Sequence, residues 1–144
     1  MNEQPNKRRF FRLKLQHPLG AELRMVGVHD TQTIRHTLKT ALLDISAGGA
    51  RFIATGPLPE EKHLLFELRF TALGKDYKPL GVMVRKVETA GGHPQYCAQF
   101  SLDEQDTASL ASVINQLSVK LRKNPVLSSC SFLTDEDLQT LGPF

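Results

Sequence analysis

Short segments between residues 12 and 100 alternate apolar and polar side chains with a period near two, and Thr, Val and Ile are frequent in them. Alternation of this kind predicts β-strands with one buried face. We expect six strands, at 21–26, 37–43, 51–54, 64–70, 81–87 and 96–100. Turn-forming residues separate them, at 46–49, 56–59, 74–78 and 91–94. Short strands at such intervals favour hairpins and predict a small antiparallel barrel or sandwich.

The period changes after Ser101. Ser101 and Glu104 match a capping box, which predicts the start of a helix, and Pro125 marks its end. Apolar residues then fall on a single helical face, at Leu110, Val113, Ile114, Leu117 and Leu121. We expect this stripe to close one mouth of the barrel; a coiled coil or a docked partner helix is the alternative.

Composition limits the class of protein. The chain has 144 residues, of which 40% are hydrophobic and 23% are charged, which is typical of one soluble domain. Its two cysteines form no disulfide framework, no uncharged stretch is long enough to span a bilayer, and the N-terminus has no signal-peptide core. Secreted and membrane-spanning classes are therefore set aside, and a cytoplasmic location is expected.

Three regions follow from these patterns: a basic arm at 1–14, a barrel with its helix at 12–123, and a C-terminal tail at 124–144. The serines and the proline after residue 124 suggest a linker, and Thr134 with the acids that follow it suggests a short helix through Leu141. The arm carries five Lys and Arg against one Glu, which is +4, whereas the other 130 residues carry −1. Such an arm attracts nucleic acid, an acidic membrane surface or a phosphorylated small molecule.

Several kinds of chemistry have no sequence signal. The five histidines lack metal-ligand spacing, and no nucleophile elbow, P-loop or dinucleotide-binding glycine motif occurs. Cys97 lies in an apolar strand, which favours packing over reactivity. Nothing in the sequence indicates an enzyme, a metal site or a bound cofactor.

Two short motifs carry the functional signal. Arg8 and Arg12 are four residues apart, so their planar guanidinium groups can converge on one ligand in either an extended or a helical chain. The second motif is Asp44-x-Ser46-x-x-Gly49, directly after an expected strand. Its Asp and Ser can accept hydrogen bonds from a base or from neighbouring backbone, and its glycines permit a positive φ and a close approach by a ligand. An ordinary Asx or Ser turn followed by a bulge is the alternative interpretation.

Together and in this order, the two motifs resemble the PilZ domain, the bacterial receptor for cyclic di-GMP. The family pattern is Arg-x-x-x-Arg near the N-terminal edge, followed roughly thirty residues later by Asp/Asn-x-Ser-x-x-Gly. Residues 81–87 look like a later strand of the family, and residues 96–100 look like its last strand, where Cys97 replaces the usual glycine. The resemblance covers about residues 7–123; the tail lies outside it.

The resemblance implies a mainly β fold, a six-stranded antiparallel β-barrel with a C-terminal α-helix, whose arm wraps the ligand against the barrel. It implies that cyclic di-GMP is bound by Lys7, Arg8, Arg9, Arg12, Asp44, Ser46 and Gly49. We expect Arg8 and Arg12 to make most phosphate and guanine contacts, Asp44 and Ser46 to read the guanine, and Gly49 to shape the turn. In the family, a basic residue at the position of Lys7 accompanies a stacked pair of ligand molecules.

The implied function is that of an adaptor that changes conformation on binding the second messenger and regulates an unidentified downstream protein, in processes such as motility, biofilm or exopolysaccharide production. We expect the arm to be mobile without ligand and to order with it, which would reposition Phe10 and Phe11. Whether the chain forms a homodimer stays open.

Two other functions compete with this interpretation. One is a general nucleic-acid binder that uses the basic arm and stacks bases on Phe10 and Phe11. Asp44 argues against it, and no DNA partner is expected, because such binding needs no carboxylate near the phosphates. The other is a non-catalytic protein-interaction module, which the Arg-x-x-x-Arg motif disfavours.

Overall fold

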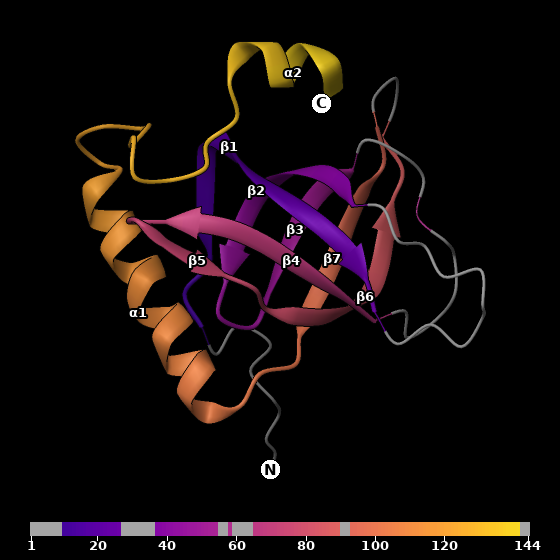
Figure 1. The fold of residues 1–144 in the computed structure, drawn as a ribbon, viewed down its shortest axis with the longest axis horizontal. Helices are drawn as coiled ribbons and strands as arrows, with labels where there is room; N and C mark the ends of the chain where they lie inside the picture. The colour runs from indigo at the N-terminus through magenta and orange to yellow at the C-terminus, as the bar shows by residue number, and fades with distance from the viewer. Residues whose placement is uncertain (1–9, 27–36, 55–57, 59–64, 90–92, 142–144) are drawn as a thin grey trace.

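The computed structural model describes residues 10–26, 37–54, 58, 65–89 and 93–141. Within these residues the chain forms seven strands and two helices (Figure 1). The strands are β1 (Leu13–Met25), β2 (Leu38–Ser46), β3 (Gly49–Ala54), β4 (Leu65–Ala72), β5 (Lys75–Tyr77), β6 (Leu80–Val87) and β7 (Gln95–Phe100). The helices are α1 (Glu104–Lys120) and α2 (Asp135–Leu141).

The strands pair antiparallel in the order β1-β2-β3-β7-β6-β4-β5, and β1 also pairs with β4. This last pairing joins the two sides of the sheet, so six of the described strands form a closed ring, as a barrel requires. The mainly β prediction is therefore confirmed. The strand β5 lies outside the ring and pairs with β4 alone among the described strands.

Two local features explain where the strands differ from the sequence prediction. The segment expected as a turn at 74–78 contains β5, because Leu73 and Gly74 with φ of 52° and 80° make a two-residue hairpin turn that leads directly into it. The strand β1 begins eight residues before the predicted strand at 21–26, and its pairing with β2 shifts register between Lys14 and Leu19. His17 and Pro18 interrupt the alternation in this stretch, but Leu13 and Leu15 before them are buried like Leu19 after them.

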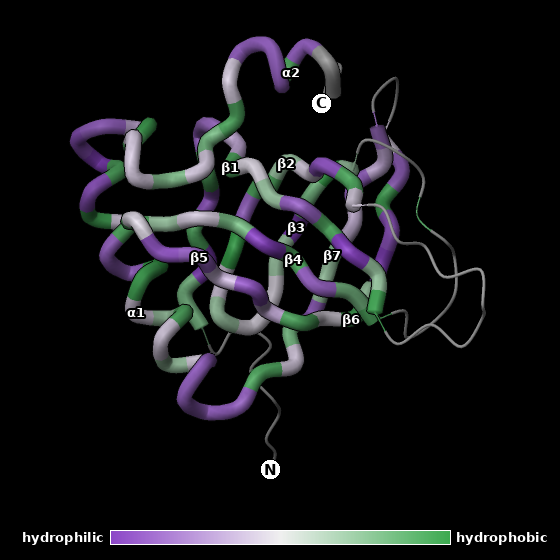
Figure 2. Tube along the Cα trace, viewed as in Figure 1, coloured by the Kyte–Doolittle hydropathy of each residue, from purple (hydrophilic) through white to green (hydrophobic). Residues whose placement is uncertain are grey.

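The core fills the interior of the closed sheet. Figure 2 shows hydrophobic and hydrophilic residues alternating along the strands, and the inward residues of β3 and β4 include Phe52 and Phe66, both fully buried with their rings edge to face. Tyr96 on β7 stacks on the ring of Phe52. Burial of such side chains supplies the main stabilisation of a domain of this size.

The helix α1 packs its apolar stripe into the same core. Its buried residues are Leu110, Val113, Ile114 and Leu117, and they belong to one cluster with the residues inside the sheet. The helix lies along one side of the sheet (Figure 1). Its first turn corrects the predicted capping box: the N-cap is Asp103, whose carboxylate accepts from the Asp106 N–H at 2.7 Å, and not Ser101. An aspartate at this position satisfies a free helix N–H and complements the helix dipole.

The tail corrects the expectation of a linker after residue 124, because it packs between β1 and β4 where these strands separate. Ser131 is the centre of this contact. Its backbone N–H donates to the Thr71 carbonyl at 2.9 Å, and its carbonyl accepts from the Gly20 N–H at 2.6 Å. Its hydroxyl donates to the Gly20 carbonyl at 2.8 Å and accepts from the Thr71 N–H at 3.0 Å. One residue therefore supplies both strands with hydrogen bonds that they do not make to each other.

The short helix predicted from Thr134 is present as α2. Thr134 and Asp137 cap it reciprocally, each side chain accepting from the other residue's N–H. A hydrogen bond from Lys39, with help from Thr134, lowers the pKa of the Asp137 carboxyl below its ordinary value. Among the described residues, no helix is both long enough and apolar enough to cross a bilayer.

Replacing Ser131 by Ala should destabilise the fold by about 1–3 kcal/mol, because the Thr71 N–H loses its acceptor in a part-buried position. Urea unfolding of the purified protein measures this change. The matched control is Ser129→Ala, whose hydroxyl is exposed and has no hydrogen bond among the described residues. Equal unfolding midpoints for the two variants would contradict the role given to Ser131.

Candidate ligand-binding site

One transverse row of polar residues crosses five strands of the sheet. The residues face one another in register: Lys14 on β1 is opposite Asp44 on β2, Asp44 is opposite Arg51 on β3, Arg51 is opposite Cys97 on β7, and Cys97 is opposite Arg85 on β6. Directly opposed residues on neighbouring strands point to the same face of a sheet. The fold therefore gathers onto one face residues that lie up to 83 positions apart in the sequence.

Register irregularities at three of the strands help to build this row. The pairing shifts after Lys14 on β1, between Leu42 and Asp44 on β2, and between Met83 and Arg85 on β6. A bulge resets the alternation of side chains and can turn an outward residue to a new position. On β6, Met83 packs on the core and the next paired residue, Arg85, is exposed.

Asp44 is the buried centre of the row. Its carboxylate is 1% exposed and accepts from two arginines: Arg12 Nη1 donates to Oδ1 at 2.7 Å, and Arg51 donates from Nε and Nη2 to Oδ2 at 3.0 and 2.8 Å. A buried carboxylate is tolerated only when it is paired and hydrogen-bonded. Asp44 meets this condition, and it fixes both guanidinium groups in doing so.

Both arginines remain accessible from outside while Asp44 holds them. The side chain of Arg12 is 38% exposed and that of Arg51 is 39% exposed. Each guanidinium has five N–H donors in a planar fork, so donors that do not bond to Asp44 remain for a further anion. The ion pairs therefore organise two cationic groups without using all of their donors.

The second predicted motif forms the hairpin between β2 and β3. The Ser46 hydroxyl accepts from the Gly48 N–H at 3.1 Å, and the Gly48 carbonyl accepts from the Phe100 N–H at 2.9 Å, which ties the turn to the end of β7. The expectation of a positive φ is wrong here, because neither Gly48 nor Gly49 adopts one. Gly49 is required for a different reason: a Cβ on it would lie 2.2 Å from the carbonyl oxygen of Ala98.

These residues line an open groove of about 820 Å³. Four lining residues are cationic, and the groove lining contains no acidic residue: the cations are Arg12, Lys14, Arg51 and Arg85. The ring of Phe10 lies at one wall, near Gly48. A groove of one charge focuses the field on its interior and attracts an anionic ligand.

The sequence located part of this groove. Arg12, Asp44, Ser46 and Gly49 come together as expected from the two motifs, whereas Lys7, Arg8 and Arg9 lie outside the described residues. The sequence interpretation missed Arg51 and Arg85 as site residues. The hairpin itself could have indicated Arg51, since a two-residue turn at 47–48 pairs position 44 with position 51. Only the bulge on β6 brings in Arg85, and the sequence carries no plain signal for it.

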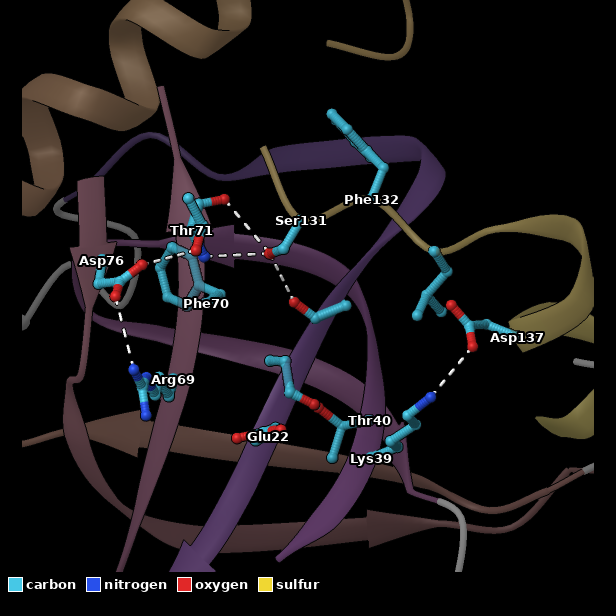
Figure 3. Close-up of a pocket in the computed structure, with 13 residues that line it drawn as sticks. Glu22, Lys39, Thr40, Arg69, Phe70, Thr71, Asp76, Ser131, Phe132 and Asp137 are labelled. Carbon is cyan, nitrogen blue, oxygen red and sulfur yellow. Dashed lines mark hydrogen bonds and ion pairs between the residues drawn. The ribbon is translucent and has the colours of Figure 1, made fainter. Parts of the chain in front are cut away.

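A second pocket, of about 520 Å³, lies between the tail and the strands β1, β2 and β4 (Figure 3). Its charged side chains are largely paired with each other: Arg69 lies 3.6 Å from Asp76, and Lys39 lies 3.1 Å from Asp137. This pocket has no excess of cations comparable to that of the groove. In the described part of the chain, no three His, Cys, Asp or Glu side chains gather as a metal site.

Comparison with known proteins connects this chain to a family. A family model described as PilZ domain matches residues 6–117. No curated protein sequence matches the chain.

Three solved structures share the fold. The PilZ domain of YcgR from Escherichia coli, solved with c-di-GMP, is 17% identical with a TM-score of 0.60, and the match covers 82% of this chain and 96% of that one. The inhibitor of motility MotI/DgrA from Bacillus subtilis is 13% identical with a TM-score of 0.62, covering 83% and 55%. The E. coli YcgR complex with c-di-GMP is 18% identical with a TM-score of 0.58, covering 81% and 48%. This chain therefore spans about half the length of the last two proteins.

Replacing Gly49 by Ala should destabilise the fold by about 1–3 kcal/mol, because the new Cβ would push the backbone of β7 away from β3. Urea unfolding measures the loss. Gly48→Ala is the matched control, since the nearest atom to its new Cβ is a Phe10 ring carbon at 3.2 Å, which belongs to a side chain that can turn. A loss at position 49 no larger than that at position 48 would show that the contact with Ala98 is unimportant.

Proposed function

Because this chain belongs to the PilZ domain family, we propose that it binds cyclic di-GMP in the groove around Asp44 and acts as an adaptor that passes the binding event to another protein. The observation that carries the proposal is the pair of guanidinium groups that Asp44 holds at the mouth of a cationic groove. The fold shared with YcgR, which was solved with c-di-GMP, supports the choice of ligand.

The chemistry of the groove suits this ligand. Cyclic di-GMP has two phosphates and two guanines. Arginine grips a phosphate with two parallel hydrogen bonds, and it donates in the same way to guanine O6 and N7. Arg12 and Arg51 present their remaining donors to the groove, and Lys14 adds a third positive charge on the same face.

Asp44 has the role of a positioning residue in this proposal. Both of its oxygens accept from arginines in the structure, so a direct contact with guanine requires Arg12 or Arg51 to release one oxygen. Its neighbour Ser46 is committed to the turn through the Gly48 N–H. We therefore propose that Asp44 and Ser46 shape the site. A structure of the complex with ligand would show whether Asp44 also contacts guanine.

The arm supplies the rest of the site. Lys7, Arg8 and Arg9 precede Arg12 by a few residues in the sequence, and we assign them as further phosphate ligands. Neutralisation of this charge by ligand would remove the mutual repulsion within the arm and let it pack on the sheet. Phe10 already contacts the core, whereas Phe11 is 53% exposed and would form part of a new surface for the downstream protein.

The cellular processes that this protein regulates are proposed from its similarity to proteins of known structure. One structural neighbour is an inhibitor of motility, which makes motility, and the biofilm and exopolysaccharide processes expected from the sequence, the first to examine. A general nucleic-acid binder and a non-catalytic interaction module remain the competing functions. The cationic groove alone suits both nucleic acid and a cyclic dinucleotide. Only a comparison of the two as ligands distinguishes these functions.

Calorimetric titration with cyclic di-GMP, GMP and a single-stranded oligonucleotide separates the three functions. We expect cyclic di-GMP to bind far more tightly than GMP, because it offers two phosphates to one groove. Arg12→Ala and Arg8→Ala should each weaken binding at least about tenfold, since a hydrogen bond to a charged group is worth about 1.5–3 kcal/mol.

The matched control is Arg24→Ala on β1, whose side chain is exposed outside the groove and lies 3.6 Å from Glu67. This variant should bind like the wild type. Oligonucleotide binding that exceeds cyclic di-GMP binding would favour the nucleic-acid function. Absence of binding by all three ligands would leave the interaction module.

A further inference from the structure

We propose that Arg51 and Arg85, on either side of Cys97, form a second anion-binding position on the sheet that holds one phosphate of the ligand independently of the N-terminal arm. This inference rests on the proposed function, because it assumes that the groove binds cyclic di-GMP. It adds Arg85 to the site, a residue in neither of the two sequence motifs.

The register places the two arginines around one residue. Cys97 on β7 is opposite Arg51 on β3 and opposite Arg85 on β6. Neighbouring strands are about 4.8 Å apart, so the two arginine backbones lie about 10 Å apart with the short cysteine side chain between them. Two long side chains rooted at that spacing can converge on one anion above Cys97.

The bulge on β6 makes this arrangement possible. The ladder pairs Met83 with Ala98 and then Arg85 with Cys97, which leaves Val84 as the extra residue. Met83 and Ala98 face the core. Without the extra residue, Val84 would be opposite Cys97 and would take the position on the outer face that Arg85 occupies. Bulges commonly occur where a strand turns a side chain toward a binding site.

The donors are available at this position. Arg51 uses Nε and Nη2 on Asp44, which leaves Nη1 for a ligand. Arg85 is exposed, lines the groove, and has no ion pair or hydrogen bond with any residue that the structure describes. An arginine without an acidic partner in a groove that has no acidic lining residue is a donor set suited to a phosphate.

The position is built on a rigid part of the fold. Arg51 and Arg85 are rooted on strands that pair on both sides within the closed sheet. Sites built on strands hold their side chains more firmly than sites on chain ends. The sheet would thus hold one phosphate of the ligand on a position fixed by its paired strands.

The affinity test uses three variants of the full chain titrated with cyclic di-GMP in a calorimeter. Arg85→Ala should weaken binding about tenfold or more, as expected for the loss of a charged hydrogen-bonding group. Arg85→Lys keeps the charge but loses the planar guanidinium group. Its affinity for cyclic di-GMP should fall between that of Arg85→Ala and that of the wild type. The matched control is Arg69→Ala on β4, whose half-exposed side chain lies outside the groove, and it should bind like the wild type.

A second readout locates the ligand. Cys97 lies in the groove and is half-buried, whereas Cys130 lies outside it and accepts from the Leu73 N–H at 3.4 Å. Saturating cyclic di-GMP should slow alkylation of Cys97 by iodoacetamide at least about threefold and leave Cys130 unchanged, because a bound phosphate would cover the thiol between the two arginines.

The possible failures are distinguishable. Wild-type protein that does not bind cyclic di-GMP overturns the proposed function and this inference with it. Binding by the wild type with unchanged affinity in Arg85→Ala overturns the inference alone, as does tight binding without protection of Cys97. Equal losses in Arg85→Ala and Arg69→Ala would reduce Arg85 to a contribution to overall charge.

Discussion

The burial of one carboxylate, that of Asp44, is the constraint on which the functional face of this protein depends. The charge of a carboxylate that is 1% exposed must be compensated by cationic or hydrogen-bonding partners. The chain meets this requirement with Arg12 from the start of β1 and Arg51 from β3. The same contacts that make Asp44 tolerable in the fold therefore place two cationic groups side by side at the surface.

The rest of the fold serves to hold that arrangement. The tight hairpin of β2 and β3 sets Asp44 opposite Arg51, and Gly49 lets this hairpin approach β7 closely. Closure of the sheet through β1 and β4 keeps the strand that follows Arg12 in place, and the tail completes the closure where β1 and β4 part. Figure 1 places the turn between β2 and β3 at the lower side of the sheet and α2 at the upper side.

Much of this fold follows from local patterns in the sequence. Alternation predicts the strands, because a closed sheet has one wet and one dry face, and the stripe of Leu110, Val113, Ile114 and Leu117 predicts the helix that packs on it. The tail could not be predicted in the same way, because the hydrogen bonds of Ser131 go to Gly20 and Thr71, which are distant in sequence. A serine-rich segment is predicted to be a linker from its composition, whether or not its serines find hydrogen-bond partners elsewhere in the fold.

The site shows the same division. Arg12, Asp44, Ser46 and Gly49 belong to short motifs and are recognisable as such, but the roles of Asp44 and Gly49 depend on neighbours across the sheet. Arg85 reaches the groove because of a bulge. A bulge depends on how two strands pair, so it cannot be predicted from the sequence of either strand alone. Register, more than composition, decides which charges meet.

In the proposed function, Asp44 acts on ligand binding through the arginines that it holds. A double-mutant cycle between Asp44→Asn and Arg12→Ala, with cyclic di-GMP affinity as the readout, tests this claim directly. If Asp44 works by positioning Arg12, the loss caused by Asp44→Asn should shrink in the Arg12→Ala background, with a coupling free energy of about 1 kcal/mol or more. Losses that add to within about 0.5 kcal/mol would contradict the account and would show that Asp44 meets the ligand on its own.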